Sequence, residues 1–326
     1  MTAPFNPPAA DLAGKPKVTP WVPPPTSKLD IDWAKLRTID LSILDNPDPT
    51  VVQDLVDTCR VAIRDDGFIF LEHYGISIEQ LHRQFDIAQY LHQHISDEDK
   101  ERLHWNPDES GTFAGWKPMW GWRSKNGPVG QGYFRQALYY ASDDVVHAKG
   151  KGTRMNGHCD FGTTTMLFSV PISSLQIWGR DEQWRYVPYK PGSLVINIGE
   201  TLELVSGGHF RATRHRVVDP PADQLSSDRL SLVLFQASEG DLRMEPAYQS
   251  PLLQREGCFD SQGAYREFKR LRERGVPIPT NRQWREVQIA DAHHPTDAAP
   301  NDKIVVKEGK RFIQREYLGV NILLPA

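Results

Sequence analysis

Hydrophobic residues recur at helical spacing in two segments near the start of the chain, 49–66 and 76–95, which predicts two amphipathic helices. Between them lies FIFLEHYG at 68–75, a short apolar run that ends in glycine and predicts a buried strand. LRTIDLSIL at 36–44 alternates apolar and polar residues, which predicts an earlier strand. This part of the chain therefore indicates an α/β region that leads into a larger sheet.

The pattern changes between Tyr133 and Gln236, where short apolar runs are separated by Gly, Pro, Asn and Asp. Many short strands at this spacing favour a sandwich or jelly roll over a doubly wound sheet. Beyond them, residues 264–274 and 281–290 predict helices. The predicted strands are YFRQALYY, TTTMLFSV, SLQIWGR, QWRYVPY, SLVINIG, ATRHRVV and RLSLVLFQ.

Composition and pattern together divide the chain into four parts. Residues 1–35 are expected to form an extended arm, because eight prolines lie within the first 26 residues. Residues 36–132 are the α/β lead-in, residues 133–240 the strand-rich core, for which catalytic residues are considered below, and residues 241–326 a helical extension.

Charge and cysteine usage limit the classes of partner. A net charge of −4 gives no electrostatic reason to expect nucleic acid or an anionic membrane. No apolar run approaches the roughly 18 residues of a transmembrane helix, and the first residues lack the pattern of a signal peptide. Cys59, Cys159 and Cys258 lie far apart, which argues against a disulfide scaffold and fits a reducing compartment. We therefore expect a soluble, cytoplasmic protein; the sequence does not indicate its oligomeric state.

Candidate metal ligands stand at His158 and Asp160. Alternate residues of a strand point to the same face, so both side chains can reach one cavity. A later histidine would complete a two-histidine, one-carboxylate set, which leaves metal positions open and is typical of Fe(II) oxygenases. His215 lies in the apolar pattern ATRHRVV, whereas His209 follows two glycines as a turn residue would, so His215 is favoured. An isolated His-x-Asp is also common where no metal binds.

A candidate carboxylate anchor follows in the next predicted strand. Arg229 and Ser231 share one strand face, and an arginine fork with a nearby hydroxyl can bind a carboxylate. A solvated arginine is the usual explanation of Arg-x-Ser alone. Its position after the histidines and the aspartate makes the combination specific.

Three segments in this order resemble the 2-oxoglutarate/Fe(II)-dependent dioxygenase family, in its isopenicillin-N-synthase-like branch: HCDFGTTTMLF, LQIWGRDEQWRYVPYKPGSLVINIGETLELVSGGHFRATRHRVV and DRLSLVLF. The resemblance covers roughly residues 133–240, and DDGFIFL at 65–71 is similar to the N-terminal region of that branch. It implies an oxidoreductase that is mainly β with flanking helices, built on a double-stranded β-helix (jelly roll) core.

The resemblance also implies roles for single residues. Fe(II) would be held by the three metal ligands named above, and Arg229 and Ser231 would bind 2-oxoglutarate, the co-substrate used with O2. Tyr140 matches a family tyrosine that supports this co-substrate, although a buried strand tyrosine needs no such role. Phe161, directly after Asp160, is a candidate wall of the substrate pocket, and a core aromatic is an equal alternative.

The segment GGHFRATRHRVVDPPADQ resembles fungal tailoring enzymes of aromatic polyketides. This resemblance implies a small-molecule substrate, a secondary metabolite of the aromatic polyketide type, and favours oxidative ring expansion to a tropolone. The alternatives are methyl or C–H hydroxylation of another fungal polyketide, and an oxidase that uses no 2-oxoglutarate. A non-enzymatic cupin-like metal binder, or a zinc hydrolase with the same ligands, forms a separate class.

One connection is shorter than in relatives of this branch. Only about fifteen residues join Gly115-Trp116-Lys117-Pro118 to the predicted strand at Tyr133, where two packed helices with connectors would need on the order of 40–50 residues. The 116–133 segment is therefore either trimmed or lacks an exon. We expect an exposed apolar flank that involves Trp120, Trp122 and Tyr133.

Overall fold

The computed structural model describes most of the chain. Its described residues are 14–104, 116, 122–124, 127–129, 132–136, 139–144, 153–259, 264–273, 275–286, 303–307, 310–317 and 320–325.

The N-terminal region begins with β1 (Thr38–Asp40), a 3-10 helix (Leu41–Asp45), α1 (Pro49–Asp65), β2 (Phe68–Glu72), α2 (Ile78–His94) and α3 (Asp97–Arg102). Local signals explain both long helices: the Asp48 carboxylate accepts from Thr50 N at the start of α1, and Ser77 forms a capping box with Gln80 at the start of α2. The strand expected over 36–44 is only three residues long. The Asp40 carboxylate accepts from Ser42 N and starts the 3-10 helix instead.

The larger sheet has seven strands in the order β1-β2-β11-β8-β13-β6-β5. Within this sheet β1 and β2 pair in parallel, and the other neighbours are antiparallel. YFRQALYY, expected as one strand, falls on two strands, because the chain reverses between Gln136 and Tyr139 and the two strands pair with each other. The remaining strands are β5 (Gly132–Gln136), β6 (Tyr139–Asp144), β8 (Thr164–Phe168), β11 (Leu194–Ile198) and β13 (Arg229–Gln236).

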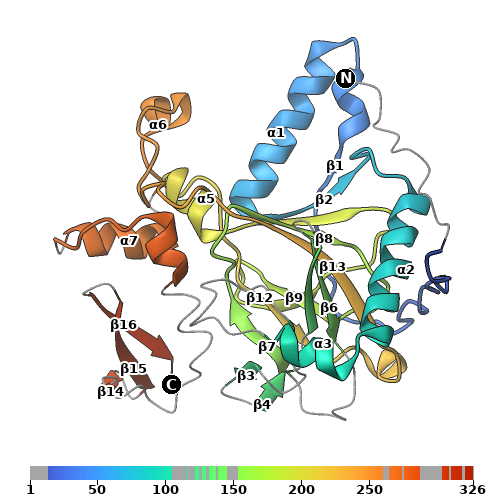
Figure 1. The fold of residues 1–326 in the computed structure, drawn as a ribbon. Helices are drawn as coiled ribbons and strands as arrows, with labels where there is room; N and C mark the ends of the chain where they lie inside the picture. Colours follow the sequence, from blue (N-terminus) through green and yellow to red (C-terminus); the bar gives the residue numbers. More distant parts are fainter. Residues whose placement is uncertain are drawn as a thin grey trace.

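A second, four-stranded antiparallel sheet has the order β10-β9-β12-β7. Its strands are β7 (Thr153–His158), β9 (Leu175–Trp178), β10 (Trp184–Tyr186) and β12 (His215–Val218). A separate short hairpin consists of β3 (Trp122–Ser124) and β4 (Gly127–Val129). Two facing sheets with helices outside confirm the expected mainly β fold with a jelly-roll core (Figure 1).

The two faces of the larger sheet serve different purposes. Alternate residues of its strands point outward to α1 and α2, where they form the main hydrophobic core. The intervening residues point inward, toward the second sheet. The outward cluster includes Ile69, Leu194, Ile196, Leu230 and Leu232 packed with Leu55, Leu81 and Phe85. The inward cluster includes Phe68, Phe70 and Val195 packed with Leu175 and Ile177.

The C-terminal part carries helices and strands. Its helices are α6 (Pro251–Glu256), α7 (Ala264–Glu273) and a helical segment at 281–286, and α7 lies beside α5 (Glu200–Val205) (Figure 1). The expectation of a helical extension over 241–326 is incomplete, because β14 (Lys303–Lys307), β15 (Lys310–Tyr317) and β16 (Val320–Pro325) form an antiparallel sheet. The signal was present as alternating runs separated by glycines at 309 and 319.

The described part of the N-terminal arm runs along the body. Trp21 stacks on Phe85 of α2, with ring centroids 4.3 Å apart, and its backbone N–H donates to Asp86. Further along, Gln224 donates to the carbonyl of Pro25 at 2.7 Å. The side chains of Trp120, Trp122 and Tyr133 lie outside the described residues, so the expected exposed flank stays a prediction. No helix in the described ranges is long and apolar enough to cross a membrane.

Candidate metal centre

Three of the predicted ligands come together at one end of the second sheet. His158 is the last residue of β7 and His215 the first of β12, and the two lie opposite each other in the antiparallel register. Their ring centroids are 4.4 Å apart. Asp160 follows two residues after β7 ends, and its Oδ1 lies 3.6 Å from the Nε2 of each histidine. One ligand atom from each residue lies within 4.8 Å of the other two, a spacing that fits one bound cation.

Asp160 is oriented by two neighbours that the sequence analysis did not identify. Its Oδ2 accepts from Thr165 Oγ1 at 2.6 Å and from Asn197 Nδ2 at 2.8 Å. Thr165 and Asn197 are partners in the β8–β11 register and both are buried. Because both donors bind Oδ2, Oδ1 is left to face the histidines. Their signal in the sequence is a polar residue at an inward position of an otherwise apolar strand, where burial requires a hydrogen-bond partner.

His215 is oriented from the other side. Its Nδ1 lies 3.1 Å from the carbonyl of Thr213, so an Nδ1–H can donate there and leave Nε2 for a cation. The Phe68 ring and the imidazole form a T-shaped pair, with ring centroids 5.6 Å apart. Burial lowers the pKa of His215, and the nearby His158 acts in the same direction. The neutral imidazole, which is the metal-binding form, is therefore favoured.

Burial alone would raise the pKa of Asp160. The rings of His215 and His158, together with the Thr165 hydroxyl bond, more than offset burial, and the pKa lies well below its ordinary value. A buried anion held between two imidazoles is the arrangement that a divalent cation would stabilise further.

The loop after Asp160 is held at close range by the start of α5. The carbonyl of Asp160 accepts from Glu200 N at 2.7 Å. This close approach requires a glycine at position 199, because a Cβ there would lie 2.3 Å from the carbonyl oxygen of Gly162. Gly162 in turn lies against β13, where a Cβ would be 2.6 Å from the carbonyl oxygen of Gln236. The loop is therefore fixed on two sides.

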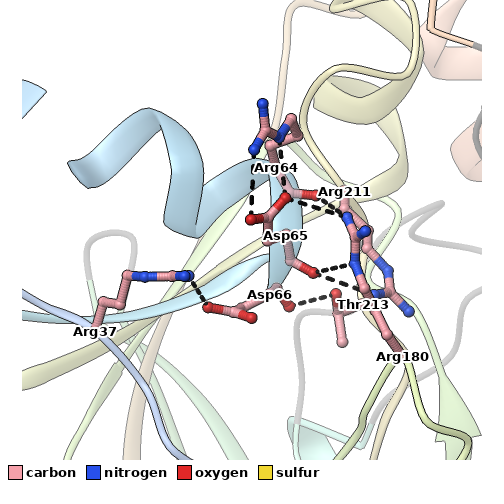
Figure 2. Close-up of polar contacts among 7 residues, drawn as sticks. All are labelled: Arg37, Arg64, Asp65, Asp66, Arg180, Arg211 and Thr213. Carbon is pink, nitrogen blue, oxygen red and sulfur yellow. Dashed lines mark hydrogen bonds and ion pairs between the residues drawn. The ribbon is translucent and has the colours of Figure 1, made fainter. Parts of the chain in front are cut away.

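The turn between α1 and β2 supports the segment that leads into β12 (Figure 2). Thr213 Oγ1 donates to the carbonyl of Asp66 at 2.7 Å, and Arg211 donates to the carbonyl of Asp65 at 3.2 Å. Arg180 also donates to Asp65 O at 2.8 Å, and Arg37 pairs with the Asp66 carboxylate. Thr213 is thus held by its side chain while its carbonyl orients the histidine two residues later.

His209, the competing histidine, lies elsewhere. It is buried in the turn after α5, and its Nε2 lies 2.8 Å from the carbonyl of Gly257. It is not among the described residues whose ligand atoms meet at the cluster. Of the two candidate histidines, it is therefore His215 that lies beside His158 and Asp160.

Arg229 and Ser231 lie at the start of β13 and are 5% and 1% exposed. The register places them on the inward face, in alternation with the outward Leu230 and Leu232. Ser231 Oγ is buried and has no hydrogen-bond partner among the described residues. A buried hydroxyl of this kind, on the same strand face as a buried arginine, fits a site for a carboxylate ligand.

Two further predicted residues are less defined. Tyr140 lies opposite Val233 in the β6–β13 register, while its side chain lies outside the described residues. Phe161 is partly buried, and its carbonyl accepts from Thr201 Oγ1 at 2.6 Å. Their roles remain predictions.

The acidic pair Glu200 and Glu203 on α5 was also not identified from the sequence. Glu203 is fully buried, and its carboxylate accepts from Ala212 N at 3.0 Å. Burial raises the pKa of Glu200 to about 8, and the negative charges of Glu203 and Asp160 act in the same direction. In the sequence, ETLELV indicates only a short helix.

Part of the chain is similar in sequence to known oxygenases. Residues 135–238 match the family described as the 2OG-Fe(II) oxygenase superfamily. A validamycin A dioxygenase from Streptomyces hygroscopicus subsp. limoneus is 32% identical over 110 residues, which are 33% of this chain and 30% of that protein. The 2-oxoglutarate-dependent dioxygenase frbH of Dothideomycetidae sp. (strain 11243) is 41% identical over 92 residues, 28% of each chain. These matches show that residues 135–238 are similar to the 2OG-Fe(II) oxygenase superfamily.

The sequence matches to these oxygenases cover only part of the chain. The chain spans less than a third of the length of the two relatives, and the family match at residues 135–238 includes the candidate ligands. The fold extends further: the crystal structure of a full-length Neurospora crassa protein in complex with alpha-KG aligns with a TM-score of 0.56 over 80% of this chain and 99% of that one, at 15% identity. This confirms the jelly-roll architecture expected from the strand pattern.

Proposed function

We propose that the protein is a non-haem Fe(II), 2-oxoglutarate-dependent dioxygenase whose iron is bound by His158, Asp160 and His215. The observation that carries the proposal is that one ligand atom from each of these residues lies within 4.8 Å of the other two, with Asp160 Oδ1 3.6 Å from the Nε2 of each histidine. Two imidazoles and one carboxylate leave coordination positions open for other ligands, as Fe(II) oxygenases require. Arg229 and Ser231 would bind the distal carboxylate of 2-oxoglutarate, with Tyr140 as a supporting candidate. When bound, Fe(II) and 2-oxoglutarate would supply dioxygen activation for oxidation of a C–H bond.

The protein's own residues hold the ligands in place. Thr165 and Asn197 bind one carboxylate oxygen of Asp160 and leave the other free for metal. The Thr213 carbonyl selects the tautomer of His215 that presents Nε2. Apolar inward residues such as Phe68 keep bulk water from this side of the site. Ordered ligands and restricted water access are what such chemistry requires of a protein.

The substrate is proposed to be a small aromatic polyketide-type secondary metabolite. Similarity to frbH and frbA, two 2-oxoglutarate-dependent dioxygenases of Dothideomycetidae sp. (strain 11243), supports a fungal tailoring reaction. Oxidative ring expansion to a tropolone is the reaction we favour; hydroxylation of a methyl or other C–H group is the alternative. Phe161, partly buried beside Asp160, is the first candidate for a residue that contacts the substrate.

Metal and co-substrate binding can be tested together. Anaerobic Fe(II) with 2-oxoglutarate should give a weak visible charge-transfer band in the wild-type protein. His215→Ala should remove the band, whereas His209→Ala should keep it, because His209 is bonded to Gly257 and lies outside the cluster. Absence of the band in the wild type would favour a zinc hydrolase or a cupin-like binder.

Turnover separates the remaining alternatives. Incubation with Fe(II), 2-oxoglutarate, O2 and a panel of aromatic polyketides should yield one succinate per oxidised product. Oxidation without succinate would instead indicate an oxidase in which Arg229 and Ser231 bind a carboxylate of the substrate. Product structures would distinguish ring expansion from hydroxylation.

A further inference from the structure

The loop that carries Asp160 presents three successive carbonyl groups to the first turn of α5. Asp160 O accepts from Glu200 N at 2.7 Å, and Gly162 O accepts from Thr201 N at 3.1 Å. The middle carbonyl, that of Phe161, accepts from the Thr201 side chain at 2.6 Å. Two of these bonds are made by backbone and survive most substitutions. The third depends on one hydroxyl group.

That hydroxyl group is itself held by the C-terminal extension. Thr201 is fully buried, and its Oγ1 accepts from Asn281 Nδ2 at 2.9 Å. Asn281 is also 0% exposed and lies 80 residues further along the chain. An amide N–H that donates to a hydroxyl, which donates to a carbonyl, forms a continuous chain in which each bond polarises the next.

Asn281 has a fixed position from which to act. Its own N–H donates to Leu242 O at 2.7 Å, and Met244 N donates to Pro279 O at 2.9 Å. Thr280 and Gln283 cap the helical segment reciprocally, with Thr280 N donating to Gln283 Oε1 at 2.9 Å. A hydrophobic cluster packs this segment against α5. The cluster consists of Leu204, Met244, Tyr265 and Phe268, with Ile278 and Trp284 packed against it.

We infer that Asn281 is a positioning residue of the metal centre, acting through Thr201 on the loop that carries Asp160. The inference rests on the proposed function, because it assumes that Asp160 binds a metal ion. The C-terminal extension is then part of the site, although none of its described residues joins the ligand cluster. Without the side-chain bond, the Phe161 carbonyl loses its buried partner and the loop gains freedom next to a ligand.

The test uses the full-length protein with Co(II) in place of iron, so that metal binding is read without turnover. The variants are Asn281→Ala, Thr201→Val and Thr201→Ser, with Met244→Leu as the matched control. Met244 Sδ lies 3.6 Å from Asn281 Nδ2, so this control alters the same buried contact and leaves the chain to Thr201 intact. The Co(II) dissociation constant, the Co(II) visible spectrum and Tm are measured for each.

Thr201→Val and Asn281→Ala should each weaken Co(II) binding by about 10-fold, the lower end of the range for residues that orient a metal ligand, and should change the Co(II) spectrum. Thr201→Ser and Met244→Leu should bind like the wild type. The double variant Thr201→Val/Asn281→Ala should bind Co(II) no more weakly than Thr201→Val alone, because both substitutions act through the Thr201 hydroxyl. If Thr201→Val does not fold, Asn281→Ala against Met244→Leu still decides the question.

A lowered Tm in Asn281→Ala with unchanged affinity and spectrum would overturn the inference and leave Asn281 with a packing role only. A wild-type protein that binds no Co(II) would instead refute the proposed function. The two failures are therefore distinguishable.

Discussion

The two carboxylate oxygens of Asp160, a candidate metal ligand, have different surroundings. One oxygen is bound by a hydroxyl and an amide from two neighbouring strands, and the other faces two imidazoles. Partners of this kind set the direction of a ligand without touching the metal. The strength of the site should therefore depend on residues outside the ligand set.

Thr165→Val and Asn197→Leu should each weaken Fe(II) or Co(II) binding by roughly 10-fold, because each removes one of the two bonds that hold Asp160 Oδ2. Anaerobic titration measures the dissociation constants. Thr164→Val is the control, since Thr164 is the preceding residue and bonds to Gln236 rather than to Asp160. If all three variants bound the metal ion as tightly as one another, Asp160 would not need the hydrogen bonds from Thr165 and Asn197 to bind metal.

Glu200 gives the apoprotein a pH dependence of stability. Its folded-state pKa is raised to about 8, so the native state retains a proton that the unfolded state loses above about 4.5. The contribution is present below pH 4.5 and is lost as pH rises toward 8, with a slope of at most ~1.4 kcal/mol per pH unit. Urea unfolding of Glu200→Gln and wild-type apoprotein at pH 5, 7 and 9 should show the variant gaining stability relative to wild type as pH rises. A pH-independent difference would contradict this assignment.

Helices and strands could be predicted from the sequence where the pattern of apolar residues lies within one segment. The helix α1 and the strand β13 follow their periodicity closely, and the pattern around His215 identified it over His209. Thr165 and Asn197 were not identified, because their role arises from the β8–β11 pairing and not from sequence spacing.

The same reason applies to the elements that were misread. The chain reversal between β5 and β6 and the C-terminal sheet both depend on pairing between separate segments. The Asn281–Thr201 bond joins positions 80 residues apart, and no local pattern indicates it. The candidate ligands could therefore be named from residue order and strand alternation, whereas the residues that hold them in place could not.

The start of α5 can approach the Asp160 loop closely because residue 199 is a glycine. In Gly199→Ala the new Cβ would meet the carbonyl oxygens of Gly162 at 2.3 Å and Asp160 at 2.9 Å, so backbone must move. We expect a loss of about 1–3 kcal/mol in unfolding free energy and weaker metal binding. Gly179→Ala is the control, because its closest neighbours are the side-chain ends of Asp181 and Arg185, which can rotate away. Chemical denaturation and Co(II) titration measure the two effects; a Gly199→Ala protein equal to the control would show that the loop yields without cost.

At the scale of the whole molecule, the N-terminal arm connects regions that are far apart in the sequence. Trp21 stacks on α2 at Phe85, and Pro25 receives a bond from Gln224, which follows β12. Gln224 is 2% exposed and also bonds to the backbone of Ser173 and Pro171, so the arm covers a buried polar junction. None of the described arm residues belongs to the ligand cluster.

The arm should therefore stabilise the fold without affecting the metal site. Trp21→Ala removes the stacked ring from Phe85, and we expect a loss of about 1–3 kcal/mol, below the range for a fully buried tryptophan because Trp21 is partly exposed. Thermal unfolding should show the lower Tm, while the Co(II) dissociation constant stays within about twofold of wild type. Val22→Ala is the matched control, since Val22 is the next residue and is 78% exposed. A Trp21→Ala protein that keeps its Tm but loses metal affinity would contradict this prediction. Metal binding would then depend on the arm, although the described arm residues contact other parts of the protein and not the ligand cluster.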